Sequence, residues 1–287
     1  MVERKIGIVA CGNSGLDYME LKFPVRMIRS ILNLDGKEYE DFVDIKADDF
    51  YKVLIENPDI DVSTSQTATG EIAKVYNEMK EDGYTDLIVI VIASKLSGTY
   101  QGAVLAKELA PDINIHVFDS KSVSYGEAHM VLETIKMIEE GKTPDEIIKQ
   151  LEKIRDSLKI YVLVDTLKYL VKNGRLSATS GFLGTLLKIK PLLEVKKDGS
   201  LVPKEKIRTT SKAQTRLFEI LQDEIKNKNV KLFIAYTNNK DKAEEIKKEL
   251  HKINDEMEVI LVPLTPVVGA HAGPGTIGIG YIDLGGK

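Results

Sequence analysis

The stretch IVIVIASKLSGT, residues 88–99, decides the fold of this chain. Its β-branched run, 88–92, predicts a buried strand, and a helix is expected to follow from Ser97 through Leu109. A strand that leads directly into a Ser-capped helix presents unpaired backbone N–H groups and the positive end of the helix dipole. Because Gly98 lets a ligand approach that backbone closely, the stretch predicts an anion site.

The composition is typical of a soluble globular protein, since 43% of the 287 residues are hydrophobic and 29% are charged. This length favours two domains. The single cysteine excludes an intramolecular disulfide framework and is typical of a reducing compartment. We find no signal-peptide pattern and no segment apolar enough to span a bilayer, so we expect a cytoplasmic protein without stable membrane insertion. The net charge of −4 does not suggest nucleic-acid binding.

Strand and helix patterns alternate through the first 160 residues. Strands are predicted at 6–10, 25–34, 88–92 and 113–118, and helices at 48–56, 69–82, 99–109, 123–140 and 144–157. Thr69 is expected to cap the second of these helices, and Thr143 with Glu146 forms a capping box ahead of the last one. The alternation predicts an α/β domain over 1–160 with a largely parallel sheet.

A second α/β domain is predicted over 161–287. Its strands are expected at 160–164, 191–195, 201–207, 230–236, 259–262 and 277–282, and its helices at 177–187, 211–226 and 241–253, with a short helix between the first strand and residue 173. Asp198-Gly199 separates two of these strands and indicates a hairpin turn. The segment 161–215 carries eleven Lys or Arg against four acidic residues, a net charge of +7. Such a surface is either simply solvated or a docking surface for an acidic partner or a phosphorylated ligand.

Three polar clusters stand at the ends of predicted elements. They are STSQ at 63–66, SKLSGT at 94–99 and HAGPGT at 271–276. Each has an ordinary explanation, namely a surface loop, a helix cap and a structural histidine. Helix capping accounts for Ser97 but not for the other polar residues of the second cluster. In the third cluster, the Gly-Pro-Gly turn beside His271 allows a close approach between the backbone and another group.

Sequence signatures of common enzyme and cofactor sites are missing or stand in the wrong context. The run 273–278 matches G-x-G-x-x-G, but it leads into a predicted strand rather than a helix, which excludes a dinucleotide site. The chain has no P-loop, no G-x-S-x-G elbow and no metal-ligand spacing among its four histidines. An α/β esterase with Ser97 as nucleophile and His271 as base remains an alternative, although no orienting acid is evident.

The polar clusters belong to a larger set of ordered blocks. These are TSQ at 64–66, SKLSGTYQ at 94–101, DSKSVS at 119–124, VDTL at 164–167, GRLS at 174–177, IKP at 189–191 and HAGPGT at 271–276. In these blocks the chain resembles the DegV family of bacterial fatty-acid-binding proteins over nearly its full length. It departs from the family at Cys11-Gly12, where an Asp-Ser-like pair is usual, and at 67–69, where prolines are frequent.

The resemblance implies a two-domain α/β fold, with a mixed sheet in the second domain and one long-chain fatty acid, such as palmitate, held between the domains. The carboxylate ligands carried over by motif are Thr64, Ser97, Gly98, Thr99 and His271. Further candidate pocket residues are Ser65, Ser94, Gly275 and Thr276. We expect the apolar helix at 177–187, with Leu192, Leu193 and Val195, to form a wall for the acyl chain.

The resemblance also implies a partner. Members of the family act as carrier subunits for a separate fatty acid kinase, which phosphorylates the bound carboxylate to an acyl phosphate. Arg175, in the GRLS block, resembles the arginine associated with that encounter. We therefore expect a non-enzymatic lipid-binding carrier in fatty acid metabolism and lipid transport, without catalytic residues, cofactor or metal.

Overall fold

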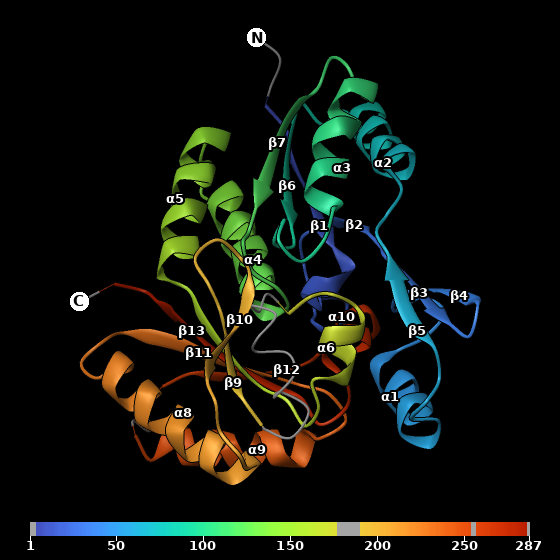
Figure 1. Cartoon of the computed structure of the whole chain (residues 1–287). Helices are drawn as coiled ribbons and strands as arrows, with labels where there is room; N and C mark the ends of the chain where they lie inside the picture. The colour runs from blue at the N-terminus through green and yellow to red at the C-terminus, as the bar shows by residue number, and fades with distance from the viewer. Residues whose placement is uncertain (1–3, 177–189, 254–256, 286–287) are drawn as a thin grey trace.

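The computed structural model shows an α/β protein built on three sheets (Figure 1). The structure describes residues 4–176, 190–253 and 257–285. The predicted fold class is confirmed, because one of the two larger sheets is parallel and the other is mixed. The predicted helix at 177–187 lies outside the described residues. The division into two domains at residue 160 stays a prediction.

The parallel sheet has the strand order β2-β1-β6-β7. Its strands are β1 (Ile6–Cys11), β2 (Val25–Ile28), β6 (Asp86–Val91) and β7 (Asn114–Asp119). Val89 and Val91 of β6 pack toward α2 (Thr69–Glu81) and α3 (Thr99–Ala106). Ile88 and Ile90, on the opposite face, pack toward α4 (Tyr125–Glu139) and α5 (Pro144–Ser157). Helices thus cover both faces, which explains why nearly all of β6 is apolar.

The mixed sheet has the order β10-β9-β8-β13-β11-β12. Its strands are β8 (Lys159–Leu163), β9 (Leu192–Val195), β10 (Leu201–Glu205), β11 (Val230–Tyr236), β12 (Val259–Pro263) and β13 (Ile277–Asp283). The predicted hairpin joins β9 to β10, and only β11 and β12 pair in parallel. One face is covered by α8 (Thr210–Ile225) and α9 (Lys240–His251). Phe233 and Ala235 of β11 belong instead to the core shared with the parallel sheet.

A small antiparallel sheet, β4-β3-β5, was not predicted. It comprises β3 (Ile31–Leu34), β4 (Lys37–Glu40) and β5 (Val62–Ser65), and α1 (Ala47–Glu56) lies in the connection between β4 and β5. The single extended element predicted at 25–34 is therefore wrong. The chain leaves the parallel sheet after Ile28, and the next residue, Arg29, makes a two-pronged ion pair with Asp17 at 2.6 Å.

Two short helices in the second half complete the fold. They are α6 (Lys168–Lys172) and α10 (Pro266–Ala272), of which the second was missed by the sequence analysis. α10 packs against α1, α6, β3 and β5, so it joins the mixed sheet to the small one. The hydroxyl of the buried Tyr51, on α1, donates to the Leu264 carbonyl just ahead of α10, at 3.0 Å.

Local signals at helix starts gave mixed results. The capping box at Thr143 is confirmed, with both reciprocal hydrogen bonds to Glu146 present. Thr69 is the first residue of α2 rather than its cap, because Ala68 occupies the capping position. The helix predicted at 123–140 begins at Tyr125, since Ser124 adopts a positive φ of 56° that a helix cannot contain.

Candidate functional site

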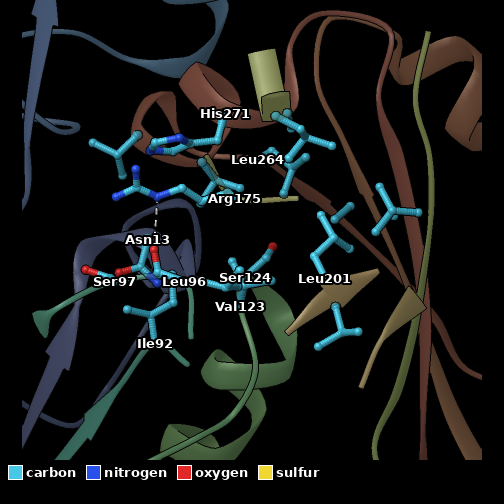
Figure 2. Close-up of a pocket in the computed structure, with 18 of the residues that line it drawn as sticks. Asn13, Ile92, Leu96, Ser97, Val123, Ser124, Arg175, Leu201, Leu264 and His271 are labelled. Carbon is cyan, nitrogen blue, oxygen red and sulfur yellow. Dashed lines mark hydrogen bonds between the residues drawn. The ribbon is translucent and has the colours of Figure 1, made fainter. Parts of the chain in front are cut away.

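A cavity lies at the carboxyl end of the parallel sheet. The chain leaves β1 toward β2 on one side and leaves β6 toward β7 on the other, so these adjacent strands form a topological switch point. Open α/β sheets bind ligands at such points. Asn13 follows β1 and Ser97 follows β6, and both line the cavity. Side chains of the mixed sheet, including Leu201 and Phe233, line it as well (Figure 2).

The lining of the cavity is amphiphilic. Of the 25 described residues that line it, fourteen are apolar and none is acidic. The two ionisable ones are Arg175 and His271. Figure 2 shows both on the same side of the cavity as Asn13 and Ser97, with Leu201 on the other side. A ligand with an anionic head and an apolar tail matches this division.

Thr64 and His271 meet at the polar side. Thr64 lies on β5 and His271 on α10, and their Oγ1 and Nε2 atoms are 2.8 Å apart. Burial, reinforced by the guanidinium of Arg175, lowers the pKa of His271 to about 4, so the ring is neutral near pH 7. When the Thr64 hydroxyl donates to Nε2, the ring proton sits on Nδ1. Nδ1 is buried and has no hydrogen-bond partner among the described residues, so it is a donor available to a ligand.

Ser97 acts at the start of α3, one position further out than predicted. Gly98 is the N-cap, and Ser97 Oγ accepts the Thr99 N–H at 3.2 Å. The Thr99 hydroxyl lies 2.8 Å from Ser97 Oγ and, if it donates there, leaves the Ser97 proton for a ligand. Thr99 itself is buried and does not line the cavity. At Gly98 a side chain would collide with the amide of Gln66, which also lines the cavity.

The structure places Arg175 at the cavity. Its Nη1 donates to the Asn173 carbonyl at 2.5 Å and its Nε to the Leu96 carbonyl at 3.3 Å. The side chain is partly buried, and no carboxylate among the described residues forms an ion pair with it. Arg175 therefore brings a positive charge to the polar side of the cavity.

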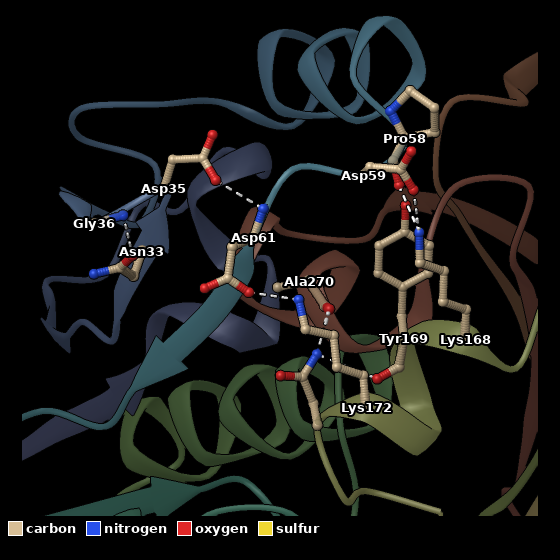
Figure 3. A network of polar contacts seen from close by, with 11 residues as sticks. Asn33, Asp35, Gly36, Pro58, Asp59, Asp61, Lys168, Tyr169, Lys172 and Ala270 are labelled. Carbon is tan, nitrogen blue, oxygen red and sulfur yellow. Dashed lines mark hydrogen bonds and ion pairs between the residues drawn. The ribbon is translucent and has the colours of Figure 1, made fainter.

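Much of the positive charge in 161–215 is balanced locally. Ion pairs engage Lys168, Lys172, Lys190, Lys196 and Lys204. Two of them tie α6 to the turn ahead of β5, where Lys168 lies 3.0 Å from Asp59 and Lys172 2.5 Å from Asp61 (Figure 3). These pairs brace the strand that carries Thr64, and they leave less of the segment free as a basic docking surface.

The remaining predicted pocket residues take other positions. The Ser94 hydroxyl donates to Asp119 at 2.6 Å, Ser65 is exposed, and the Gly275 N–H donates to Asn238 at 2.9 Å; none of the three lines the cavity. Thr276 does line it, although its hydroxyl donates to the Ala272 carbonyl at 2.9 Å.

Several polar residues that line the cavity were not predicted from the sequence as site residues. They are Asn13, Ser30, Gln66 and Ser124. Asn13 could have been found from its place directly after the first strand of a parallel sheet, because the carboxyl ends of adjacent strands share one edge. The expected apolar wall is described only in part. Val195 lines the cavity, Leu192 and Leu193 do not, and 177–187 lies outside the described residues.

The geometry gives little support to nucleophilic catalysis. His271 forms its hydrogen bond with Thr64 rather than with Ser97, and no carboxylate in the described part of the chain contacts its Nδ1. The third member of a hydrolytic triad is thus missing from residues 4–176, 190–253 and 257–285. Within the same ranges, we find no cluster of three or more metal-ligating side chains and no helix long and apolar enough to cross a membrane.

Comparison with known proteins identifies relatives of the whole chain. The sequence profile described as "Uncharacterised protein, DegV family" matches residues 5–284. A DegV domain-containing protein of Staphylococcus aureus is 37% identical over 253 residues, which cover 86% of each chain. The crystal structure of DegV, a fatty acid binding protein from Bacillus subtilis, has a TM-score of 0.90 at 28% identity and covers 98% of this chain and 100% of its own. A stearic acid-binding protein from Eubacterium ventriosum has a TM-score of 0.87 at 27% identity, with 97% and 98% covered.

Proposed function

This chain belongs to the DegV family, and on that premise we propose that it binds one long-chain fatty acid in the cavity between its two larger sheets. The carboxylate lies at the polar side, where Ser97 supplies one hydrogen-bond donor and the hydrogen-bonded pair of Thr64 and His271 supplies another. Arg175 supplies the positive charge. The acyl chain runs along the apolar residues of β8, β9 and β11.

One observation carries this proposal, namely that the cavity combines an apolar lining with donors and a cation but with no acidic group among the described residues that line it. A neutral lipid would leave the Arg175 charge without a partner, and a small polar anion would not use the apolar wall. Solved relatives with fatty acid binding in their descriptions support the same ligand class.

The expected energetics favour tight binding. Burying about 14 methylenes at about 0.8 kcal/mol each gives on the order of 11 kcal/mol of gross transfer free energy. Lost translational and rotational freedom offsets roughly 4 kcal/mol or more of this. The tail therefore supplies most of the affinity, whereas the polar head fixes the direction of the ligand.

We further propose that the protein is a non-catalytic carrier that presents the carboxylate to a partner fatty acid kinase, which forms the acyl phosphate. No cofactor is needed for such a role. The apolar lining of the cavity would keep water away from a hydrolysable acyl phosphate. The single cysteine, Cys11, is buried and free, which is consistent with a reducing compartment such as the cytoplasm.

Lipid extraction tests the ligand. We expect native mass spectrometry of the purified protein to show one fatty acid per chain, of a length given by analysis of the extract. Ala235→Phe, which fills the cavity beside β11, should lower the occupancy, whereas Val104→Phe, at an exposed position on α3, should not. A wild-type protein that neither retains nor takes up any fatty acid would contradict the proposal.

Ester hydrolysis tests the alternative. The carrier should show no turnover of a p-nitrophenyl acyl ester, and Ser97→Ala should weaken fatty acid binding without abolishing it. Turnover by the wild type that disappears in Ser97→Ala would assign an esterase instead.

A further inference from the structure

Asn13 and Glu127 form a buried polar pair beside the cavity. Asn13 lies in the short 3-10 helix Gly12–Ser14 directly after β1, and Glu127 lies in the first turn of α4. Asn13 Nδ2 donates to Glu127 Oε2 at 2.7 Å. Asn13 is 5% exposed and lines the cavity, whereas Glu127 is completely buried.

The pair is costly to keep in a protein core. A buried carboxyl loses its hydration, and Glu127 Oε1 has no hydrogen-bond partner among the described residues. Burial raises the pKa of Glu127 well above its usual range, and the Asn13 amide and the Cys11 backbone N–H only partly oppose the shift. The shift opposes a negative charge on Glu127 next to an anionic ligand.

The hydrogen-bond donors of Asn13 indicate a role for the Asn13–Glu127 pair. A side-chain amide has two N–H donors and one carbonyl acceptor. One N–H is held by Glu127, and no residue in the described part of the chain takes the other in a hydrogen bond. Asn13 and Ser97 both line the cavity, and Figure 2 shows them on the same side of it. While Glu127 Oε2 accepts from Nδ2, the Asn13 carbonyl is turned away from that oxygen.

We propose that Asn13 is a ligand of the bound head group, which donates its second amide N–H to the carboxylate, and that Glu127 is the positioning residue that fixes the orientation of this amide. The inference rests on the proposed fatty acid binding and adds a further side-chain donor to it, on the side of the carboxylate nearest β1. It also gives a reason for keeping the Glu127 carboxyl in the protein core.

Acid and alcohol ligands of equal length separate a head-group contact from a structural effect. We would measure the dissociation constants of palmitic acid and of hexadecanol by calorimetry, for the wild type and for Asn13→Ala. A hydrogen bond to a charged group is worth about tenfold or more in affinity. Asn13→Ala should therefore weaken palmitic acid binding about tenfold and hexadecanol binding by less than about twofold.

Two variants test Glu127. Glu127→Leu keeps the volume but removes the acceptor, so it should weaken palmitic acid binding by about threefold to tenfold. Glu127→Gln keeps an acceptor for Asn13 in a neutral side chain and should recover most of that loss. In Asn13→Ala/Glu127→Leu the loss should be no larger than in Asn13→Ala alone, because both changes remove one interaction.

Thr134→Val is the matched control. Thr134 is also completely buried on α4, but its hydroxyl donates to the Met130 carbonyl at 2.8 Å and does not line the cavity. It should change the unfolding midpoint and leave the ratio of acid to alcohol affinity unchanged. Equal losses for both ligands in Asn13→Ala would assign Asn13 a structural role and overturn the inference. A wild type that binds neither ligand would instead remove the proposed function itself.

Discussion

His271 Nε2 lies 2.8 Å from Thr64 Oγ1, although 207 positions separate the two residues in the sequence. The contact joins α10, which belongs to the second half of the chain, to β5 of the small sheet. It therefore forms only when the two halves are packed together. The polar side of the cavity is thus a product of the tertiary fold, and its chemistry depends on elements that hold α10 and β5 in place.

The Thr64 hydroxyl should matter more for the acid head than for the tail. Thr64→Val keeps the shape and suits a strand, but it removes the hydrogen bond to His271 that fixes the ring proton on Nδ1, where it can be donated to the ligand. We expect about a tenfold loss in palmitic acid affinity by calorimetry, with hexadecanol affinity nearly unchanged. Thr64→Ser, which retains the hydroxyl, is the control. If both variants lose equally, the hydroxyl does not bind the head group.

Gly269 should be required for the position of α10. A Cβ at residue 269 would collide with the hydroxyl of Tyr51 and lie 2.7 Å from two of its ring carbons. Tyr51 is fully buried and hydrogen-bonded to the Leu264 carbonyl, so moving it aside would lower the stability of the fold. We expect Gly269→Ala to lower the free energy of unfolding by about 1–3 kcal/mol in urea titrations and to weaken fatty acid binding through His271.

Gly70, in the first turn of α2, provides the comparison for that substitution. Its Cβ would meet no atom within 4 Å, so Gly70→Ala should leave binding unchanged and raise stability by up to about 1 kcal/mol. Similar losses in both variants would show that the Tyr51 contact is not the cause.

Local signals predicted the parts of the fold that local interactions determine. The apolar run of β6 followed by Ser-Gly-Thr predicted a strand, a turn and a helix, and the structure has all three. The capping box at Thr143 is confirmed because its hydrogen bonds lie within four consecutive residues. The same reasoning located Ser97 and His271, which stand in conspicuous polar runs and line the cavity.

The small sheet could not be predicted in the same way. In β5 only Val62 is buried and Thr64 partly so, while Ser63 and Ser65 are exposed. One face of β5 is buried only because β3 and α10 pack beside it. The sequence of β5 is mostly polar, so it does not by itself indicate a half-buried strand. Asn13 was missed for a related reason, since an asparagine after a strand resembles an ordinary turn residue until the neighbouring strand is known.

Asp41 should make stability depend on pH. It is completely buried, and burial raises its pKa to about 7. The negative charge of Asp17 adds to this increase, whereas the Val267 N–H and the charge of Arg29 oppose it only partly. An unfolded aspartate has a pKa of about 3.9, so the folded protein binds the proton more tightly between about pH 4 and 7. Ionising Asp41 therefore lowers the free energy of unfolding as the pH rises through this window.

Asp41→Asn removes that ionisation. Its free energy of unfolding relative to the wild type should rise between about pH 4 and 7 and then stay constant, as measured by urea titrations at several pH values. A difference that is the same at every pH would mean that the pKa of Asp41 is the same in the folded and the unfolded protein. The comparison with the wild type cancels the histidines and other carboxyls, which titrate in both proteins.

Arg175 should prove to be part of the cavity as well as of any partner surface. Its charge contributes to the low pKa of His271 and meets no carboxylate among the described residues. Arg175→Gln should therefore raise the pKa of His271 from about 4, as followed by NMR, and weaken palmitic acid binding while hexadecanol binding is kept. Arg175→Lys, which retains the charge, should restore both. If Arg175→Gln and Arg175→Glu leave palmitic acid affinity intact but reduce phosphorylation by a fatty acid kinase, the arginine serves docking alone, because only the partner then requires its guanidinium.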